Sequence, residues 1–91
     1  MIARNFLVVD QHGLHAVPAQ LLAKLVRSVP FDVFAEDPVS GRFPADNLLM
    51  LMSLKVHKGE HLRIILDTPD AGDAELFFEE VQNILLPKEL Q

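Results

Sequence analysis

The sequence predicts an α+β domain in which an antiparallel or mixed sheet is covered on one face by helices. The chain has 91 residues, of which 49% are hydrophobic and six are phenylalanine, and this is enough for one small core. Short apolar runs with strand character are interspersed with segments of helical spacing, in the order β-α-β-β-α-β-α. Such an order, without strict alternation, favours a sheet with helices on one face. We expect a single domain over residues 1–91, with a frayed tail at 87–91.

The first half of the chain is expected to hold a strand, a helix and two short strands. Residues Ile2 to Val9 are rich in β-branched and apolar side chains and end in Asp-Gln-His-Gly, which indicates a strand followed by a turn. The segment Phe31 to Ala35 and a short stretch near Arg42 and Phe43 are expected to be strands, because Asp-Pro and Ser-Gly breakers separate them. A helix is expected from Ala16, with apolar positions at helical intervals at Pro18, Leu21, Leu22, Leu25, Val26 and Val29.

The second half is expected to add a short helix, a strand and a longer helix. Asp46 and Asn47 are both good N-cap residues for the apolar segment LLMLMSL, which Lys55 to Gly59 breaks. The segment EHLRIIL indicates a strand, and DTPD closes it with turn chemistry. Asp70 or Asp73 then caps a helix with a broad apolar face, made of Ala74, Phe77, Phe78, Val81, Ile84 and Leu85.

Composition argues against several classes of function. The net charge of -5 would repel a nucleic-acid backbone. The chain has no cysteine, so neither disulfides nor a thiolate metal site can stabilise it. The longest apolar run, Leu48 to Met52, is far below the about 20 residues that span a bilayer. We therefore expect a soluble, cytoplasmic protein that neither binds nucleic acid nor inserts into a membrane. We also expect a monomer, although composition does not bear on this.

The segment QHGLHAVPAQ places His15 at the expected start of a helix. The first N–H groups of a helix have no internal partners and the helix dipole adds positive charge there, so an anion site is expected. This end would stabilise a phosphoryl group on a ring nitrogen of His15. Gly13 allows the sharp turn before the helix, and Pro18 costs little because its missing N–H has no partner in the first turn. On these residues alone, a plain capping or packing role for His15 is the alternative.

Two segments resemble a known family. The segment GLHAVPAQLLAKL is similar to the active-site segment of the HPr phosphocarrier proteins of the phosphoenolpyruvate-dependent sugar phosphotransferase system, whose pattern is Gly-Leu-His-Ala-Arg-Pro-Ala. The segment ADNLLMLMSLKVHKGEHLRIIL is similar to the second helix and fourth strand of that family, and the resemblance covers about Ile2 to Leu86. It implies an open-faced β-sandwich, with four antiparallel strands covered on one face by three helices.

The resemblance also implies a site and partners. His15 would accept a phosphoryl group on Nδ1 from enzyme I, which took it from phosphoenolpyruvate, and pass it to an enzyme IIA domain. Gly13, Ala16 and Val17 would lie beside the phosphate, which helix amides contact. The protein would then be a carrier in a relay rather than a self-contained enzyme, and no cofactor is implied.

The sequence departs from the family pattern at two positions. Val17 stands where the family has an arginine, the side chain best suited to hold phosphate with paired donors. Asn47 stands where some members present a serine to a regulatory kinase, so that regulation is expected to be absent. Lys24 and Arg27 lie two to three turns along the helix from the histidine, too far to touch a phosphate. The resemblance implies that these two residues meet acidic partners, and a solvated helix face is the alternative. Gln20 is also expected to bind partners.

The short helix is apolar all round, so some of its side chains must face outward. The resemblance places Leu48, Leu49 and Met52 beside His15 as a surface that binds partners, and methionine adapts to more than one partner. The alternatives are a homodimer contact or an unusually buried helix.

A zinc site is one other function that fits part of the sequence. His12 and His15 form an H-x-x-H pattern, and His57 and His61 are four residues apart. The second pair straddles Gly59 in a turn, and no cysteine completes a set of ligands, so no metal is expected.

A degenerate family member, which binds partners without carrying phosphate, is the other alternative. The valine at position 17 fits it. The presence of His15 together with Gly13 and Pro18 favours the phosphocarrier instead.

Overall fold

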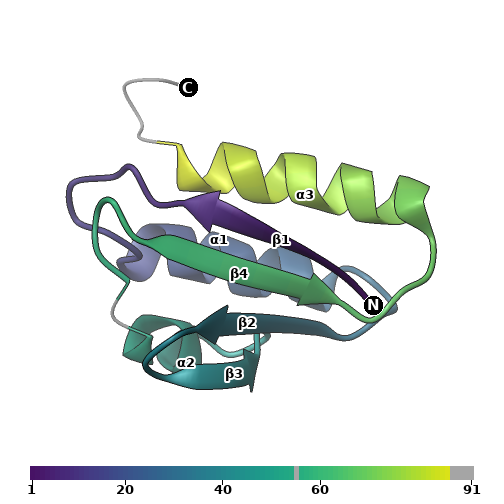
Figure 1. Ribbon diagram of the computed structural model, residues 1–91, viewed down its shortest axis with the longest axis horizontal. Helices are drawn as coiled ribbons and strands as arrows, with labels where there is room; N and C mark the ends of the chain where they lie inside the picture. The colour runs from purple at the N-terminus through teal and green to yellow at the C-terminus, as the bar shows by residue number, and fades with distance from the viewer. Residues whose placement is uncertain (55, 87–91) are drawn as a thin grey trace.

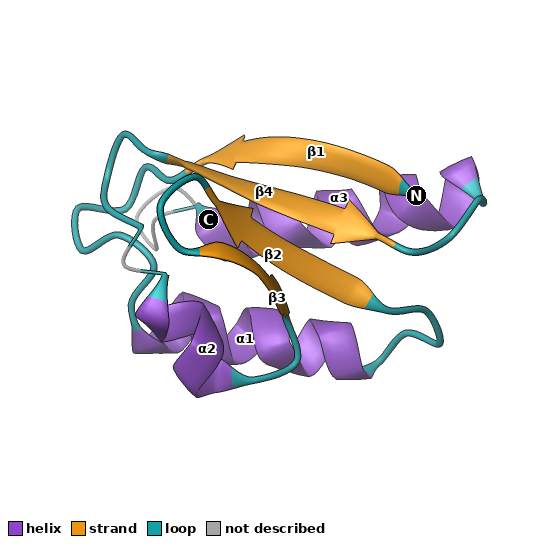
Figure 2. Ribbon diagram, turned by 60° about the horizontal axis from the view of Figure 1, so that its bottom comes forward, coloured by secondary structure: helices purple, strands orange, loops and turns teal. Residues whose placement is uncertain are grey.

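The computed structural model describes residues 1–54 and 56–86, and there the predicted order of strands and helices is confirmed. The strands form one antiparallel sheet in the order β1-β4-β2-β3, with all three helices on one face (Figures 1 and 2). This is the predicted open-faced β-sandwich. The expected tail at 87–91 and Lys55 of the expected helix break lie outside the described residues. The elements are β1 (Ile2–Leu7), α1 (Ala16–Arg27), β2 (Val33–Asp37), β3 (Gly41–Pro44), α2 (Leu48–Ser53), β4 (His61–Leu66) and α3 (Ala71–Leu85).

The core lies between the sheet and the helices. Leu62, Ile64 and Leu66 alternate along β4, and all three are buried on the helix side of the sheet. The predicted apolar face of α3 is confirmed apart from Ile84, which is only partly buried. The Phe78 ring of this helix lies 5.7 Å from the Phe6 ring of β1, centroid to centroid, so α3 is fixed across the first strand.

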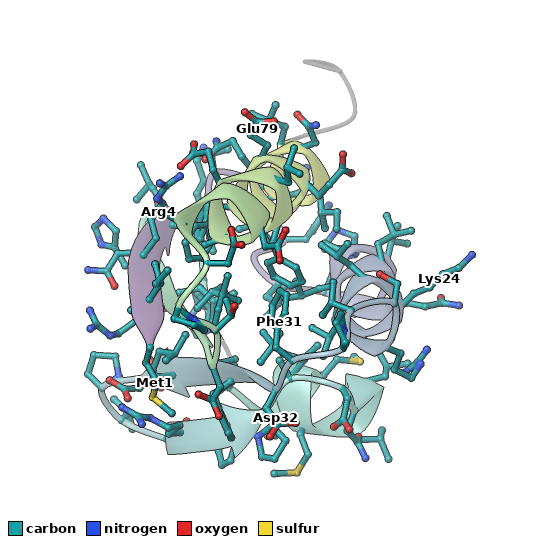
Figure 3. All side chains as sticks on the ribbon, turned by 90° about the vertical axis from the view of Figure 1, so that its right-hand side faces the viewer. Met1, Arg4, Lys24, Phe31, Asp32 and Glu79 are labelled. Carbon is teal, nitrogen blue, oxygen red and sulfur yellow. The ribbon has the colours of Figure 1, made fainter. Side chains whose placement is uncertain are left out.

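The second strand begins later than predicted. The expected strand was Phe31 to Ala35, whereas β2 begins at Val33. Pairing with β4 begins at Val33, opposite Leu66. Phe31 lies in the preceding loop, where its ring packs edge-to-face against Phe77 with centroids 6.0 Å apart (Figure 3). An apolar residue before a strand can therefore belong to the core without joining the sheet.

The buried face of α1 also differs from the prediction at Leu21, whose side chain is 47% exposed. Leu21 lies next to the buried Leu22 in sequence, so it points about 100° away from it around the helix. Two small residues, Ala19 and Ala23, take the place of larger side chains against the core. The buried face of α1 is therefore centred on Leu22 and these alanines, and Leu21 lies at the surface.

The sequence offers two candidate N-cap residues for α2 and two for α3, and the structure shows which one caps each helix. Asn47, rather than Asp46, caps α2, because its side chain accepts the Met50 N–H at 3.2 Å. Asp70 caps α3 by accepting the Asp73 N–H at 2.9 Å. The short α2 thus has a defined beginning even though few of its side chains are buried.

The loop between β1 and α1 is fastened to the segment that follows α2. Leu14 N–H donates to the Val56 carbonyl at 2.9 Å, and Gly59 N–H donates to the Val8 carbonyl at 2.8 Å. Gly13 has a φ of +66° and lies so close to Val56 that an added methyl group would overlap the carbonyl oxygen of that residue. Position 13 therefore requires glycine for two independent reasons, the left-handed backbone and the close approach to Val56.

Gly13→Ala is expected to lower the free energy of unfolding by at least about 2 kcal/mol, because the methyl group adds a clash to a left-handed backbone. Gly41→Ala is the matched control. Gly41 has a φ of +88° and no atom within 4 Å of an added methyl group, so this variant should lose only about 1 kcal/mol. Urea unfolding followed by circular dichroism measures both values, and equal losses would contradict the constraint at Val56.

Candidate functional site

His15 is the N-cap residue of α1, as the sequence predicted. Its backbone is extended, with φ −89° and ψ −172°, and its carbonyl accepts the Ala19 N–H at 3.1 Å. Within the described chain, the imidazole makes no capping hydrogen bond to the first turn. The ring is therefore not used to cap the helix, and the first amides of α1 stay available.

Two first-turn amides point toward the space in front of the helix. Ala16 and Val17 are the first residues of α1, and the next position is Pro18, which has no N–H. The first N–H groups of a helix have no acceptor within the helix, so these amides can donate to an anion. The N–H of Gly13 is different, since it donates to the Asp10 carbonyl at 2.9 Å. Gly13 thus contributes the shape of the turn rather than a donor.

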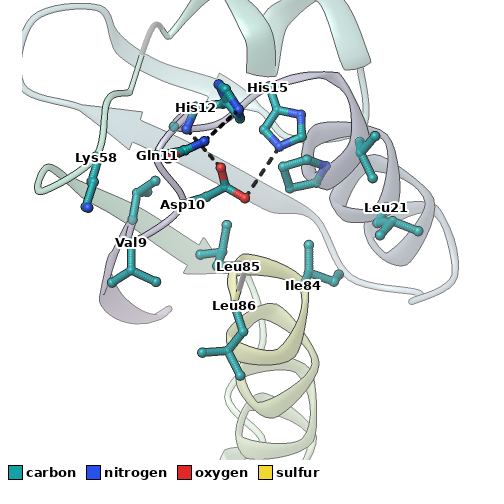
Figure 4. A pocket seen from close by; sticks show the side chains of 14 residues that line it. Val9, Asp10, Gln11, His12, His15, Leu21, Lys58, Ile84, Leu85 and Leu86 are labelled. Carbon is teal, nitrogen blue, oxygen red and sulfur yellow. Dashed lines mark hydrogen bonds and ion pairs between the residues drawn. The ribbon is translucent and has the colours of Figure 1, made fainter. Parts of the chain in front are cut away.

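Asp10 brings a carboxylate to the His15 ring, a contact that the sequence pattern did not predict. Its Oδ2 lies 3.6 Å from Nε2 of His15, and its Oδ1 accepts the His12 N–H at 2.9 Å (Figure 4). The His12 N–H holds the pKa of this carboxyl below its usual range, and the neighbouring His15 acts in the same direction. The sequence places an aspartate at the end of the expected strand, five residues before the histidine. This spacing alone does not show that the turn folds so that Asp10 faces the His15 ring.

The two histidines of the H-x-x-H pattern do lie together. The His12 and His15 rings meet edge-to-face, with centroids 5.9 Å apart. The other pair does not complete a set of ligands, because Nδ1 of His57 lies 3.0 Å from the Glu60 carboxylate in a separate turn. Over residues 1–54 and 56–86, no three His, Asp or Glu side chains are close enough together to hold a metal ion.

A cleft of about 470 Å³ opens beside His15 (Figure 4). Its walls are the β1–α1 loop, the start of α1 and the end of α3, and the apolar side chains of Val17, Leu21 and Ile84 line it. Lys58, from the turn before β4, also lines this cleft. Helical and strand periodicity could not predict that position, because it depends on how the turn after α2 folds against the β1–α1 loop.

The predicted partner-binding residues of α1 lie at the surface. Gln20 and Lys24 are exposed, and Lys24 projects away from the sheet (Figure 3). Arg27 has a structural contact as well, because its Nη1 donates to the Asp46 carbonyl at 2.9 Å. This hydrogen bond ties the end of α1 to the loop before α2.

The outer face of α2 is apolar, as expected. Leu49 is 76% exposed and Met52 is 40% exposed, whereas Leu51 is buried. Leu48 is partly buried and packs against the core, and its predicted part in partner binding stays a prediction. Met50, which is 37% exposed, belongs to the outward face instead. The apolar surface of α2 therefore consists of Leu49, Met50 and Met52, and its role in binding stays a prediction.

No helix in the described part of the chain combines the length and the apolar character needed to cross a membrane.

The fold and the site define a class of small α+β protein that presents a histidine at a helix N-terminus, beside two available amides and an apolar cleft. The family described as the PTS HPr component phosphorylation site matches residues 2–84. The chain belongs to this PTS-HPr family, which confirms the resemblance found in the sequence.

Solved structures show the same fold. HPr-C-His from Thermoanaerobacter tengcongensis is 20% identical, with 93% of this chain and 91% of that chain covered and a TM-score of 0.77. The phosphocarrier protein HPr from Bacillus anthracis is 24% identical, with coverage of 93% and 96% and a TM-score of 0.76. Crh from Bacillus subtilis, described as a domain-swapped dimer, is 30% identical, with coverage of 96% and 100% and a TM-score of 0.64. No curated protein sequence matches the chain significantly.

Proposed function

We propose that the protein accepts a phosphoryl group from enzyme I on Nδ1 of His15 and passes it to an enzyme IIA domain. The observation that carries this proposal is the place of His15 as the N-cap of α1, where its side chain leaves the amides of Ala16 and Val17 available. Membership of the PTS-HPr family supports a phosphocarrier role. A monomeric state and a cytoplasmic location are parts of the same proposal.

The transfer needs a nucleophile and donors for the phosphoryl oxygens. The lone pair of Nδ1 attacks the phosphorus atom carried by enzyme I, the bond from phosphorus to enzyme I breaks, and a new N–P bond forms on His15. The amides of Ala16 and Val17 donate to the phosphoryl oxygens, and the positive end of α1 favours their charge. Delivery to enzyme IIA is the same exchange, with His15 as the leaving group.

Val17 makes this site a weaker holder of phosphate than one with arginine at the same position. Its side chain is 55% exposed and offers no hydrogen-bond donor. A hydrogen bond to a charged group contributes about 1.5 to 3 kcal/mol, which corresponds to roughly a ten- to hundredfold difference in an equilibrium or rate. The expected result is a slower carrier rather than an inactive one.

His15→Ala is expected to abolish labelling by enzyme I and phosphoenolpyruvate, measured as an acid-labile phosphoryl group on the protein. His12→Ala is the control and should keep most of the label, because Asp10 is held by the backbone N–H of residue 12, which alanine retains. Similar labelling of the two variants would rule out His15 as the acceptor.

Val17→Arg is expected to speed transfer from enzyme I by about ten- to hundredfold, because it supplies a guanidinium where the other parts of the site are present. Rapid-quench measurements on wild type and variant with the same enzyme I would give the ratio. If neither protein is phosphorylated, the alternative of a regulator that binds partners without carrying phosphate replaces the carrier.

Leu49→Glu is expected to weaken enzyme I binding by about 1 to 3 kcal/mol with little loss of stability, because it places a charge on the apolar surface of α2. Val39→Glu is the matched control, since Val39 is 93% exposed in the turn between β2 and β3. Calorimetric titration compares the two. Equal weakening in both variants would show that net charge, rather than the α2 surface, controls docking.

A further inference from the structure

Asp10 is held in one orientation in front of the His15 ring. Its Oδ1 accepts the His12 N–H at 2.9 Å, and this contact turns Oδ2 toward Nε2 of His15, 3.6 Å away (Figure 4). Both side chains are partly shielded from water, with 24% of Asp10 and 36% of His15 exposed. The Asp10 carboxylate is therefore held so that it faces Nε2 of His15 rather than Nδ1.

Asp10 is the negatively charged partner of this ring. Among the described residues that line the cleft, the other titratable side chains are His12 and Lys58, and neither can become an anion. The end of α3 and its C-cap residue contribute only apolar side chains to the cleft, namely Ile84, Leu85 and Leu86. Asp10 is thus the one anionic side chain among the described residues that line the cleft, and it faces Nε2.

An ionised carboxylate has acceptor atoms only, so it favours a hydrogen on the ring nitrogen that faces it. A neutral imidazole carries one hydrogen, and the nitrogen without it keeps a lone pair. The His12 N–H keeps the pKa of Asp10 low, and the carboxyl is therefore ionised at neutral pH. These conditions select the ring form with the hydrogen on Nε2 and the lone pair on Nδ1.

We propose that Asp10 is a positioning residue that holds the proton of His15 on Nε2 and so leaves Nδ1 as the nucleophile. The consequence for transfer rests on the proposed phosphocarrier function, whereas the choice of tautomer does not. When the N–P bond forms at Nδ1, the proton stays on Nε2 and the ring becomes positively charged. Asp10 stabilises that charge from the side of the ring that the phosphoryl group does not occupy. No proton is gained or lost in the exchange.

Asp10→Asn tests the tautomer directly. It removes the charge and keeps an acceptor for the His12 N–H. At about pH 9, where imidazoles are neutral, ¹⁵N chemical shifts give the ratio of the Nε2–H form to the Nδ1–H form. For a partly exposed charge pair we expect this ratio at His15 to fall by about two- to fivefold. An unchanged ratio would overturn the proposal.

Glu60→Gln is the matched control, because the Glu60 carboxylate lies 3.0 Å from Nδ1 of His57. This variant should change the tautomer ratio of His57 and leave that of His15 as in wild type, whereas a shift at His15 of the size seen in Asp10→Asn would overturn the proposal. If Asp10→Asn does not fold, Asp10→Ser carries the same test, since its hydroxyl can accept the His12 N–H without a charge.

A transfer measurement separates this proposal from the carrier function. With enzyme I and phosphoenolpyruvate, Asp10→Asn should be phosphorylated about two- to fivefold more slowly than wild type. Equal rates despite a changed tautomer ratio would overturn the role of Asp10 in transfer. Absence of label on wild type would overturn the carrier function, and the ¹⁵N ratio would then decide the role of Asp10 alone.

Discussion

The position of His15 depends on the contact between the β1–α1 loop and the backbone that follows α2. Leu14 N–H donates to the Val56 carbonyl, and Gly13 lies against the same group with a left-handed backbone. Because both anchors immediately precede His15, they fix the direction in which the chain enters α1. Two features therefore bring His15, the start of α1 and the cleft together. One is the buried hydrogen bond from Leu14 to Val56, and the other is the close approach of Gly13 to Val56, which only glycine permits.

The amides at the start of α1 are the hydrogen-bond donors beside His15, and Lys58 is the cationic side chain among the described residues that line the same cleft. A helix N-terminus contributes about 0.3 to 1 kcal/mol toward a nearby negative charge, less than a charged hydrogen bond from arginine would. Val17 removes that arginine contribution, and Asp10 adds negative charge on the other side of the ring. For a carrier, weaker holding slows acceptance and also makes donation to the next protein more favourable, so the same residues affect both halves of the relay.

Periodicity and capping residues were enough to predict the order of the elements, because each helix and strand has its own apolar pattern. His15 was predicted because its surroundings, Gly13 to Pro18, are contiguous in sequence. Asp10 and Lys58 were missed, since they reach the ring or the cleft through turns, and the direction of a turn is not contained in a repeat of 3.6 or 2 residues. The exposure of Leu21 differs from the prediction because a broad apolar stripe does not reveal which of its edges faces solvent.

The sheet order also determines when this site can exist during folding. β1 pairs only with β4, so Ile2 finds its partner at Leu66, and the anchor for Gly13 comes from Val56. Pairing between such distant segments closes a long loop, which makes it a slow and late event compared with helix formation. As the chain leaves the ribosome, α1 can therefore form well before His15 has its final surroundings. The surroundings of His15 are therefore completed by residues, such as Val56, that are synthesised more than forty positions after it.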